Sequence, residues 1–236
     1  AGLYGCPTAV NNVETLCNVP LIVSRGGEWY ASLGPEKNGG PKLFCVSGHV
    51  VRPGVYEGTM HTTVRQLIYD YAGGIANGRQ LKAVIPGGSS VPVLRPDQID
   101  VPASFDGLMK AGSMLGSAGM IVMDDTTCMV WMAENLLHFY SHESCGKCTP
   151  CREGGAWLLN ILRKIERGEG RMQDIDLLLG VADNIAGKTL CAFGDAAATP
   201  VLATIKQFRD EFEAHVREGR CTCPAAWRAS AAVHAH

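Results

Sequence analysis

The sequence predicts an α+β protein in which a small β-rich module precedes four helices. Gly and Pro, 28 and 12 of the 236 residues, are concentrated in the first 120 residues, where they divide short strand-like runs. The last 110 residues are poorer in Gly and richer in Leu, Ile, Ala and Met, with apolar positions at helical spacing. This change indicates two regions of different architecture.

Composition and charge restrict the possible functions. With 46% hydrophobic and 19% charged residues, the chain is suited to a packed core rather than to disorder. A net charge of −2 argues against nucleic-acid binding, because no basic stripe is available to neutralise phosphates. No apolar run approaches the ~20 residues of a membrane span, and no basic-then-apolar leader follows Ala1. We therefore expect an intracellular protein whose ten cysteines are thiols or metal ligands rather than disulfides.

Residues 1–40 begin with a loop composition. A short helix or strand follows from Val13 to Val23, and Gly26 and Gly27 end it. We expect this segment to be the tail of an FMN-binding α/β domain, on the resemblance described below, with the front half of that domain absent.

Residues 41–95 predict a small β-rich module. A strand over residues 42–48 pairs with a second strand, entered through a Pro-Gly turn, to form a hairpin. One-sided apolar positions predict a helix over residues 63–71, and residues 81–85 form a third strand. The order β-β-α-β favours a β-grasp sheet with one helix across it.

Residues 126–219 predict an up-and-down four-helix bundle, connected to the sheet by an irregular segment, residues 96–125, that holds one more strand at residues 119–123. Thr126 or Thr127 can cap the first helix. Residues 220–236 show no pattern and are expected to be a flexible tail. The apolar positions of the four helices include Met129, Met132, Leu136, Leu137, Leu158, Ile161, Leu162, Ile165, Ile175, Leu178, Leu179, Ile185, Val201, Ile205, Phe208 and Phe212.

The strongest signal of chemistry is a run of three cysteines, Cys145, Cys148 and Cys151, spaced three residues apart. Thiolates at this spacing can surround one face of a compact soft-metal group, which favours a [4Fe–4S] cluster with four Cys ligands. The run lacks the further Cys-Pro of a bacterial ferredoxin, so the fourth ligand has to come from elsewhere.

The predicted helix order supplies this fourth cysteine. The triplet lies between the first and second helices, and in an up-and-down bundle the loop between the third and fourth helices lies at the same end. That loop contains Cys191. Cys128, Cys221 and Cys223 are expected at the opposite end and are poorer candidates.

Other interpretations of the cysteines remain open. A structural zinc site is the main alternative for the triplet, although zinc usually takes two separated pairs of ligands. Cys6, Cys17 and Cys45 are expected to be buried thiols. Cys221 and Cys223 can bind metal or become oxidised, but we prefer a solvated tail.

A weaker signal lies near the start of the chain. Asn11, Asn12 and Thr15 can present amides and a hydroxyl to a polar ligand, although an Asn-Asn pair is usually a turn. The sequence contains no Gly-x-Gly-x-x-Gly before a helix, so it shows no complete dinucleotide-binding fingerprint.

Four blocks of the sequence carry a family resemblance. They are GLYGCPTAVNNVETL from residue 2, SGHVVRPGVYE from residue 47, ESCGKCTPCREG from residue 143 and LCAFGDAA from residue 190. In this order they resemble the C-terminal portion of the NADH-binding flavoprotein subunit of respiratory complex I. The same module occurs in NAD-dependent formate dehydrogenases and NAD-reducing hydrogenases. The resemblance extends from residue 1 to about residue 219.

The resemblance implies FMN in a Rossmann-like domain, followed by a β-grasp module of the SLBB type and a helical bundle with one [4Fe–4S] cluster. In this family NADH gives a hydride to FMN, and electrons pass singly to the cluster. The implied cluster ligands are Cys145, Cys148, Cys151 and Cys191. The implied FMN contacts are Asn11, Asn12, Thr15, Ala192 and Phe193, and no catalytic residue is assigned.

The resemblance also implies an NAD(H)-dependent oxidoreductase working in either direction, in the cytoplasm or peripheral on the cytoplasmic or matrix side of a membrane. The implied partners are a thioredoxin-like [2Fe–2S] subunit and a further iron–sulfur acceptor subunit. The family's Gly-rich FMN and NADH loop has no counterpart here, so we expect this chain not to bind NADH by itself. Two alternatives are a zinc-bound scaffold that docks partners through its β-grasp surface and a nucleic-acid-binding β-grasp module, which the charge of −2 disfavours.

Overall fold

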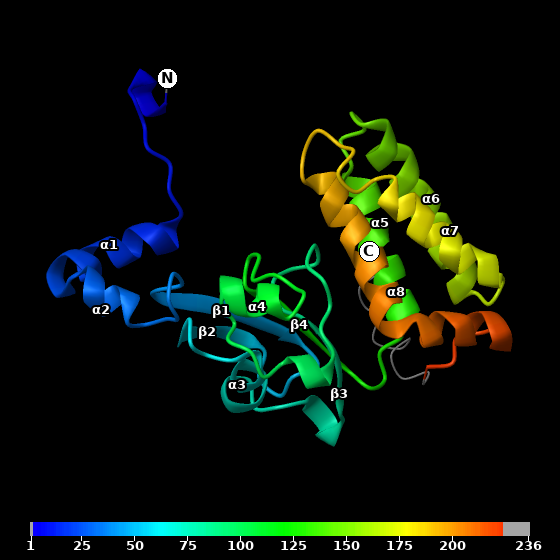
Figure 1. Cartoon of the computed structure of the whole chain (residues 1–236), viewed down its shortest axis with the longest axis horizontal. Coiled ribbons are helices and arrows are strands. Elements are labelled where there is room, and N and C mark those ends of the chain that lie inside the picture. Colours follow the sequence, from blue (N-terminus) through cyan, green and yellow to red (C-terminus); the bar gives the residue numbers. More distant parts are fainter. Residues whose placement is uncertain (1, 224–236) are drawn as a thin grey trace.

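The computed structural model describes residues 2–223. Figure 1 shows an N-terminal arm, a sheet with short helices around it, and a set of long helices. The arm leads into α1 (Val13–Arg25) and α2 (Gly27–Ala31). Glu14 of α1 holds this part to the sheet, because its carboxylate pairs with Lys42 Nζ at 2.6 Å and accepts a bond from the Leu43 N–H at 2.8 Å.

The sheet has four strands in the order β2-β1-β4-β3. The strands are β1 (Pro41–Gly48), β2 (Gly54–Thr59), β3 (Leu81–Ile85) and β4 (Gly119–Asp124). Strand β1 is antiparallel to β2 and parallel to β4, and β3 is antiparallel to β4. A capping box at Thr63 starts α3 (Val64–Gln66), which continues as a π-helical turn (Leu67–Tyr71). Phe44, Leu67, Ile68 and Val122 are fully buried between this helix and the sheet, which confirms the β-β-α-β prediction.

The segment 96–125, expected to be a connection, belongs to the sheet module. Strand β4 lies between β1 and β3 in the middle of the sheet, and Leu108 of α4 (Phe105–Lys110) and Leu115 are buried in the same core. The expected boundary at residue 95 therefore differs from the structure. Turn composition suggested a linker, but pairing between distant strands decides which residues share a core.

The four predicted long helices are present. They are α5 (Met129–Glu143), α6 (Thr149–Glu166), α7 (Met172–Asp183) and α8 (Phe193–Glu218). No helix among residues 2–223 is both long enough and apolar enough to cross a membrane. The buried core they share includes Leu137, Leu158, Leu162, Ile165, Ile175, Leu178, Val201, Ile205 and Phe212.

The cap of α5 differs from the prediction. Cys128 is the N-cap residue, and its Sγ accepts a bond from the Trp131 N–H at 3.3 Å. Thr126 instead donates its hydroxyl to the Asp124 carboxylate at 2.6 Å. Because Asp124 satisfies Thr126 in the preceding turn, the helix starts later, at Met129.

The sheet and the helices share a smaller apolar core that includes Ile85, Met123, Met129 and Phe208. Helix α8 has a kink at Phe208, whose backbone leaves helical geometry at φ −136° and ψ 32°. The Arg95 guanidinium lies 5.0 Å from the centre of the Phe208 ring and donates to the carbonyl O of Gln207 at 2.6 Å. This contact satisfies a backbone acceptor at the kink, beyond which the last turns of α8 run in a new direction (Figure 1).

Several cysteines differ from expectation. Cys6, Cys17 and Cys45, expected to be buried, are exposed. Cys221, expected in a solvated tail, is 9% exposed and packs against the helical core. The predicted tail therefore does not begin at residue 220, and residues 224–236 lie outside the described residues. Apolar neighbours in sequence did not indicate which thiols are covered by distant segments.

The close approach of β1 and β4 depends on Gly48, which has φ +88°. A Cβ at Gly48 would lie 2.1 Å from the carbonyl O of Val122. We expect Gly48→Ala to lower the free energy of unfolding by about 2–4 kcal/mol, because backbone strain adds to a clash with a paired strand. Urea unfolding followed by circular dichroism measures this change.

The control is Gly180→Ala, inside α7, where a Cβ would meet nothing within 4 Å. This substitution should stabilise the protein by about 0.5–1 kcal/mol through helix propensity. Equal effects of the two substitutions would contradict the role assigned to Gly48.

Asp174 joins α6 to the first turn of α7. Its carboxylate accepts bonds from Lys164 Nζ at 2.8 Å and from the Arg171 N–H at 2.9 Å. Burial alone would raise the pKa of Asp174, but the hydrogen bonds from Lys164 and Arg171 outweigh it and lower the pKa to about 2. A carboxylate with a lowered pKa stabilises the fold above its unfolded pKa, and this contribution disappears only as the pH falls toward the folded value.

We therefore expect Asp174→Asn to lower the free energy of unfolding by about 2 kcal/mol, equally at about pH 5.5 and pH 8. Asp176→Asn on the same helix is the control, since the Asp176 side chain is 68% exposed and its pair with Arg209 should contribute below about 1 kcal/mol. A difference for Asp174→Asn that disappears at pH 8 would contradict this account.

Candidate iron–sulfur centre

The three-cysteine run forms the connection between α5 and α6. Cys148 is the N-cap residue of α6, Pro150 lies in its first turn, and Cys151 is buried at 9% exposure. Gly146 adopts φ +76°, which permits the sharp turn between Cys145 and Cys148. The thiols therefore surround the N-terminus of α6, where the helix dipole and N–H groups favour negative charge.

The connection between α7 and α8 reaches the same end of the helices (Figure 1). The Leu190 N–H donates to Cys148 Sγ at 3.4 Å, so this loop contacts the cysteine run directly. The Gly187 N–H donates to Asp195 Oδ1 at 2.6 Å, and Thr189 Oγ1 donates to the carbonyl O of Cys191 at 2.9 Å. These bonds hold the loop that carries Cys191 beside the triplet.

Close packing shapes this loop. A Cβ at Gly194, in the first turn of α8, would lie 2.3 Å from Thr189 Oγ1. On the other side of the centre, Arg152 Nη1 donates to the carbonyl O of Gly146 at 2.6 Å, which ties the α5–α6 loop to α6. Both loops are therefore restrained from their own helices.

The arrangement of the four thiols suits a group larger than a single ion. Cys145 and Cys191 are exposed, Cys148 is half-buried and Cys151 is buried. Within residues 2–223, none of these cysteines belongs to a set of three or more ligand atoms that all lie within 4.8 Å of one another. A tetrahedral zinc ion needs such contact, whereas a [4Fe–4S] cluster spreads its four thiolates over the corners of a cubane.

The residues expected at the flavin form two separate groups. Asn11, Asn12 and Thr15 are exposed at the arm and the start of α1. Ala192 is exposed beside Cys191, and the Phe193 ring contacts Tyr140 edge-on with centroids 5.5 Å apart. Figure 1 shows the arm and the cysteine-bearing helix ends as separate projections on the same side of the sheet, so the structure does not bring the two groups together.

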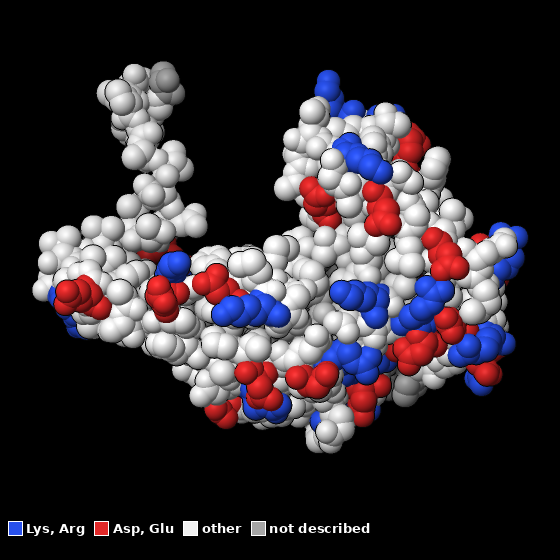
Figure 2. All heavy atoms as spheres, viewed as in Figure 1, with Lys and Arg blue, Asp and Glu red and all other residues white. Residues whose placement is uncertain are grey.

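The arm itself is uncharged and apolar. Residues 2–12 contain no Lys, Arg, Asp or Glu, and Figure 2 shows them without charged atoms. Tyr4 and Val10 expose 93% and 90% of their surface. Exposed apolar surface of this kind is typical of a segment that packs against another polypeptide.

Sequence reasoning missed a second set of ligand-type side chains at the opposite end of the helices. Cys128 and Cys221 meet Glu166 and His215 there. The predicted helix order places Cys221 at this end, but the lack of a pattern around it favoured a solvated tail. The signal that could have identified the set is His215, which precedes Cys221 by about one and a half helical turns.

Comparison with known proteins covers both halves of the fold. Residues 131–215 match the family described as the NADH-ubiquinone oxidoreductase-F iron-sulfur binding region, and residues 42–122 match the SLBB domain. All four candidate cluster ligands lie within the first match.

Among relatives, 221 residues are 52% identical to the second NADH-quinone oxidoreductase F subunit of Rhizobium meliloti, covering 94% of this chain and 52% of that protein. The NADH-quinone oxidoreductase F subunit of Mycobacterium tuberculosis is also 52% identical, with 94% of this chain and 49% of that protein covered. The chain thus spans about half the length of these relatives.

A solved structure shows the same fold. The chain resembles a polypeptide in a crystal structure of the air-oxidized NAD+-reducing [NiFe]-hydrogenase at a TM-score of 0.79 and 34% identity, covering 91% of this chain and 36% of that one. With both domain matches, these similarities show that the chain belongs to the family of NADH-quinone oxidoreductase F subunits, of which it represents the C-terminal SLBB and [4Fe–4S]-binding region.

Proposed function

We propose that this chain transfers electrons between FMN and other redox centres through a [4Fe–4S] cluster bound by Cys145, Cys148, Cys151 and Cys191. The observation that carries the proposal is the contact between the two loops, in which the Leu190 N–H donates to Cys148 Sγ. This contact places the loop of Cys191 at the triplet, within a region that matches an iron–sulfur binding family.

When bound, FMN exchanges a hydride with NAD(H), and the cluster accepts one electron at a time. The chain's own residues position and tune these groups. Cys148 and Cys151 lie at the N-terminus of α6, so backbone N–H groups favour their thiolate forms. The Leu190 N–H donates to the Cys148 sulfur, and such bonds raise the potential of a cluster.

The proposal extends to the assembly. We infer that the chain works within an NADH dehydrogenase or NAD-reducing module, beside a thioredoxin-like [2Fe–2S] subunit and a further iron–sulfur acceptor. Asn11, Asn12 and Thr15 on one side and Ala192 and Phe193 on the other would contribute to the FMN site. The exposed apolar surface of Tyr4 and Val10 supports burial of the arm against further polypeptide.

The cluster can be tested directly. The anaerobically purified chain, reduced with dithionite, is expected to contain about four irons and four sulfides and to give the low-temperature EPR signal of a reduced [4Fe–4S] cluster. Cys191→Ala should abolish this signal and lower the iron content, because it removes one of four ligands.

Cys45→Ala is the matched control, since Cys45 is an exposed thiol in the sheet. It should retain both iron and signal. Zinc in place of iron and sulfide, or an unchanged signal in Cys191→Ala, would overturn the assignment.

Charge near the cluster should set its potential. Lys147 is exposed between Cys145 and Cys148. We expect Lys147→Glu to lower the midpoint potential by roughly tens of millivolts, because a negative charge disfavours the reduced cluster.

A redox titration followed by EPR measures this shift. Lys110→Glu makes the same change of charge on α4 in the sheet module and should leave the potential unchanged because of distance and screening. A rise for Lys147→Glu, or equal shifts for both variants, would contradict the expectation.

A further inference from the structure

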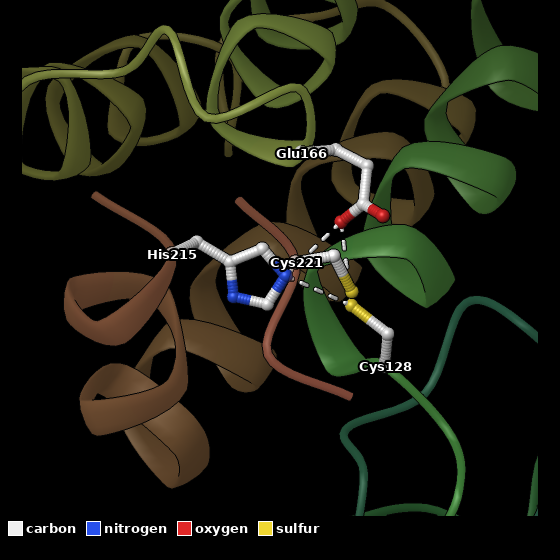
Figure 3. Close-up of side chains that lie close together, drawn as sticks. All are labelled: Cys128, Glu166, His215 and Cys221. Atoms are coloured by element: carbon white, nitrogen blue, oxygen red, sulfur yellow. Dashed lines mark hydrogen bonds and ion pairs between the residues drawn. The ribbon is translucent and has the colours of Figure 1, made fainter. Parts of the chain in front are cut away.

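A second group of metal-binding side chains lies at the end of the helices opposite the cysteine run. Cys128 caps α5, Glu166 ends α6, His215 lies in the last turns of α8, and Cys221 follows that helix. One ligand atom from each lies within 4.8 Å of all the others. Figure 3 shows the four side chains converging from these separate elements.

Burial makes this convergence unusual. His215 and Cys128 are fully buried, and Cys221 is 9% exposed. A polar cluster of this kind is costly in a protein interior unless its groups are paired or bind a metal. The sequence around it offers thiols and an imidazole, the ligands that zinc prefers.

The distances between the ligand atoms fit a tetrahedral ion. His215 Nε2 lies 3.3 Å from Cys128 Sγ and 3.3 Å from Glu166 Oε2, and Cys128 Sγ lies 3.3 Å from the same carboxylate oxygen. Ligands bonded to zinc at about 2.0–2.3 Å are separated by about 3.3–3.8 Å along the edges of the tetrahedron. The observed separations match those edges.

The orientation of His215 also fits a ligand. Its Nδ1 lies 2.8 Å from the carbonyl O of Glu211. A carbonyl only accepts, so Nδ1 carries the hydrogen and the neutral imidazole directs the lone pair of Nε2 toward Cys128 and Glu166. Metal-bound histidines are commonly held by such a bond from their second nitrogen.

A third thiol lies next to this group. Cys223 and Glu211 form a further set with Cys128, with ligand atoms within 4.8 Å of one another. Glu211 is already engaged, because its Oε1 accepts from the Met129 N–H at 2.8 Å and its Oε2 pairs with Lys82 Nζ at 2.8 Å. Cys223 therefore remains as a soft ligand beside Cys128.

We propose that Cys128, His215 and Cys221 bind a structural zinc ion, with Glu166 or the Cys223 thiolate completing its four ligands. The ion joins the start of α5 to the end of α8 and to the segment after it. The site is closed and redox-inactive, so its role is to stabilise this end of the helical region. It is independent of the iron–sulfur assignment, since the two sites share no residue.

Metal analysis of the chain, expressed with zinc and iron supplied, tests the proposal. We expect about one zinc per chain in addition to the iron of the cluster. Cys128→Ala and Cys221→Ala should each lower zinc at least about tenfold while iron and the reduced EPR signal persist, which shows that the helices still fold. Cys191→Ala should do the reverse, losing iron and keeping zinc, and Cys17→Ala, at an exposed thiol on α1, should keep both metals.

Stability gives a second measurement. A zinc chelator should lower the melting temperature of the parent chain and leave that of Cys221→Ala unchanged. Iron-replete protein without zinc, zinc retained in both cysteine variants, or iron bound at these residues would overturn the proposal. A count of free thiols in denaturant that is two short, restored by reduction and absent in Cys221→Ala, would also overturn it by showing a disulfide between Cys128 and Cys221.

Discussion

The alternating direction of the four long helices is the constraint on which the candidate centre depends. Each helix buries one apolar stripe, and residues such as Leu158, Leu178, Val201 and Phe212 meet in one core. Burial of apolar surface at about 25 cal/mol per Å² holds the antiparallel arrangement together. This arrangement brings the α5–α6 and α7–α8 connections to one end, and the hydrogen bond from Leu190 to Cys148 then aligns them.

The same alternation creates the opposite end, where the N-terminus of α5 meets the C-termini of α6 and α8. Here the kink at Phe208 matters, because it changes the course of α8 before His215. Arg95 satisfies the backbone at this kink from the sheet module, and Lys82 of β3 pairs with Glu211 one turn before His215. The sheet thus shapes the end of the helical region that holds the proposed zinc ligands, while the proposed cluster ligands lie at the end away from it.

This division suits an electron-transfer module. A centre that exchanges electrons needs an accessible side, and Cys145 and Cys191 are exposed. A structural ion needs enclosure, and Cys128 and His215 are fully buried. The uncharged arm before α1 adds a surface for further polypeptide on the same side of the sheet as the exposed cysteines (Figures 1 and 2).

Local spacing along the chain was enough to predict many of these features. Apolar stripes identified all four long helices, alternating runs identified the strands, and the spacing of Cys145, Cys148 and Cys151 indicated the cluster. Helix count was enough to place Cys191 at the same end. Contacts between distant residues set the rest: β4 in the middle of the sheet, the kink at Phe208, and the burial of Cys221. Periodicity records which face of an element is apolar, but the partner that covers that face is chosen only when the chain folds.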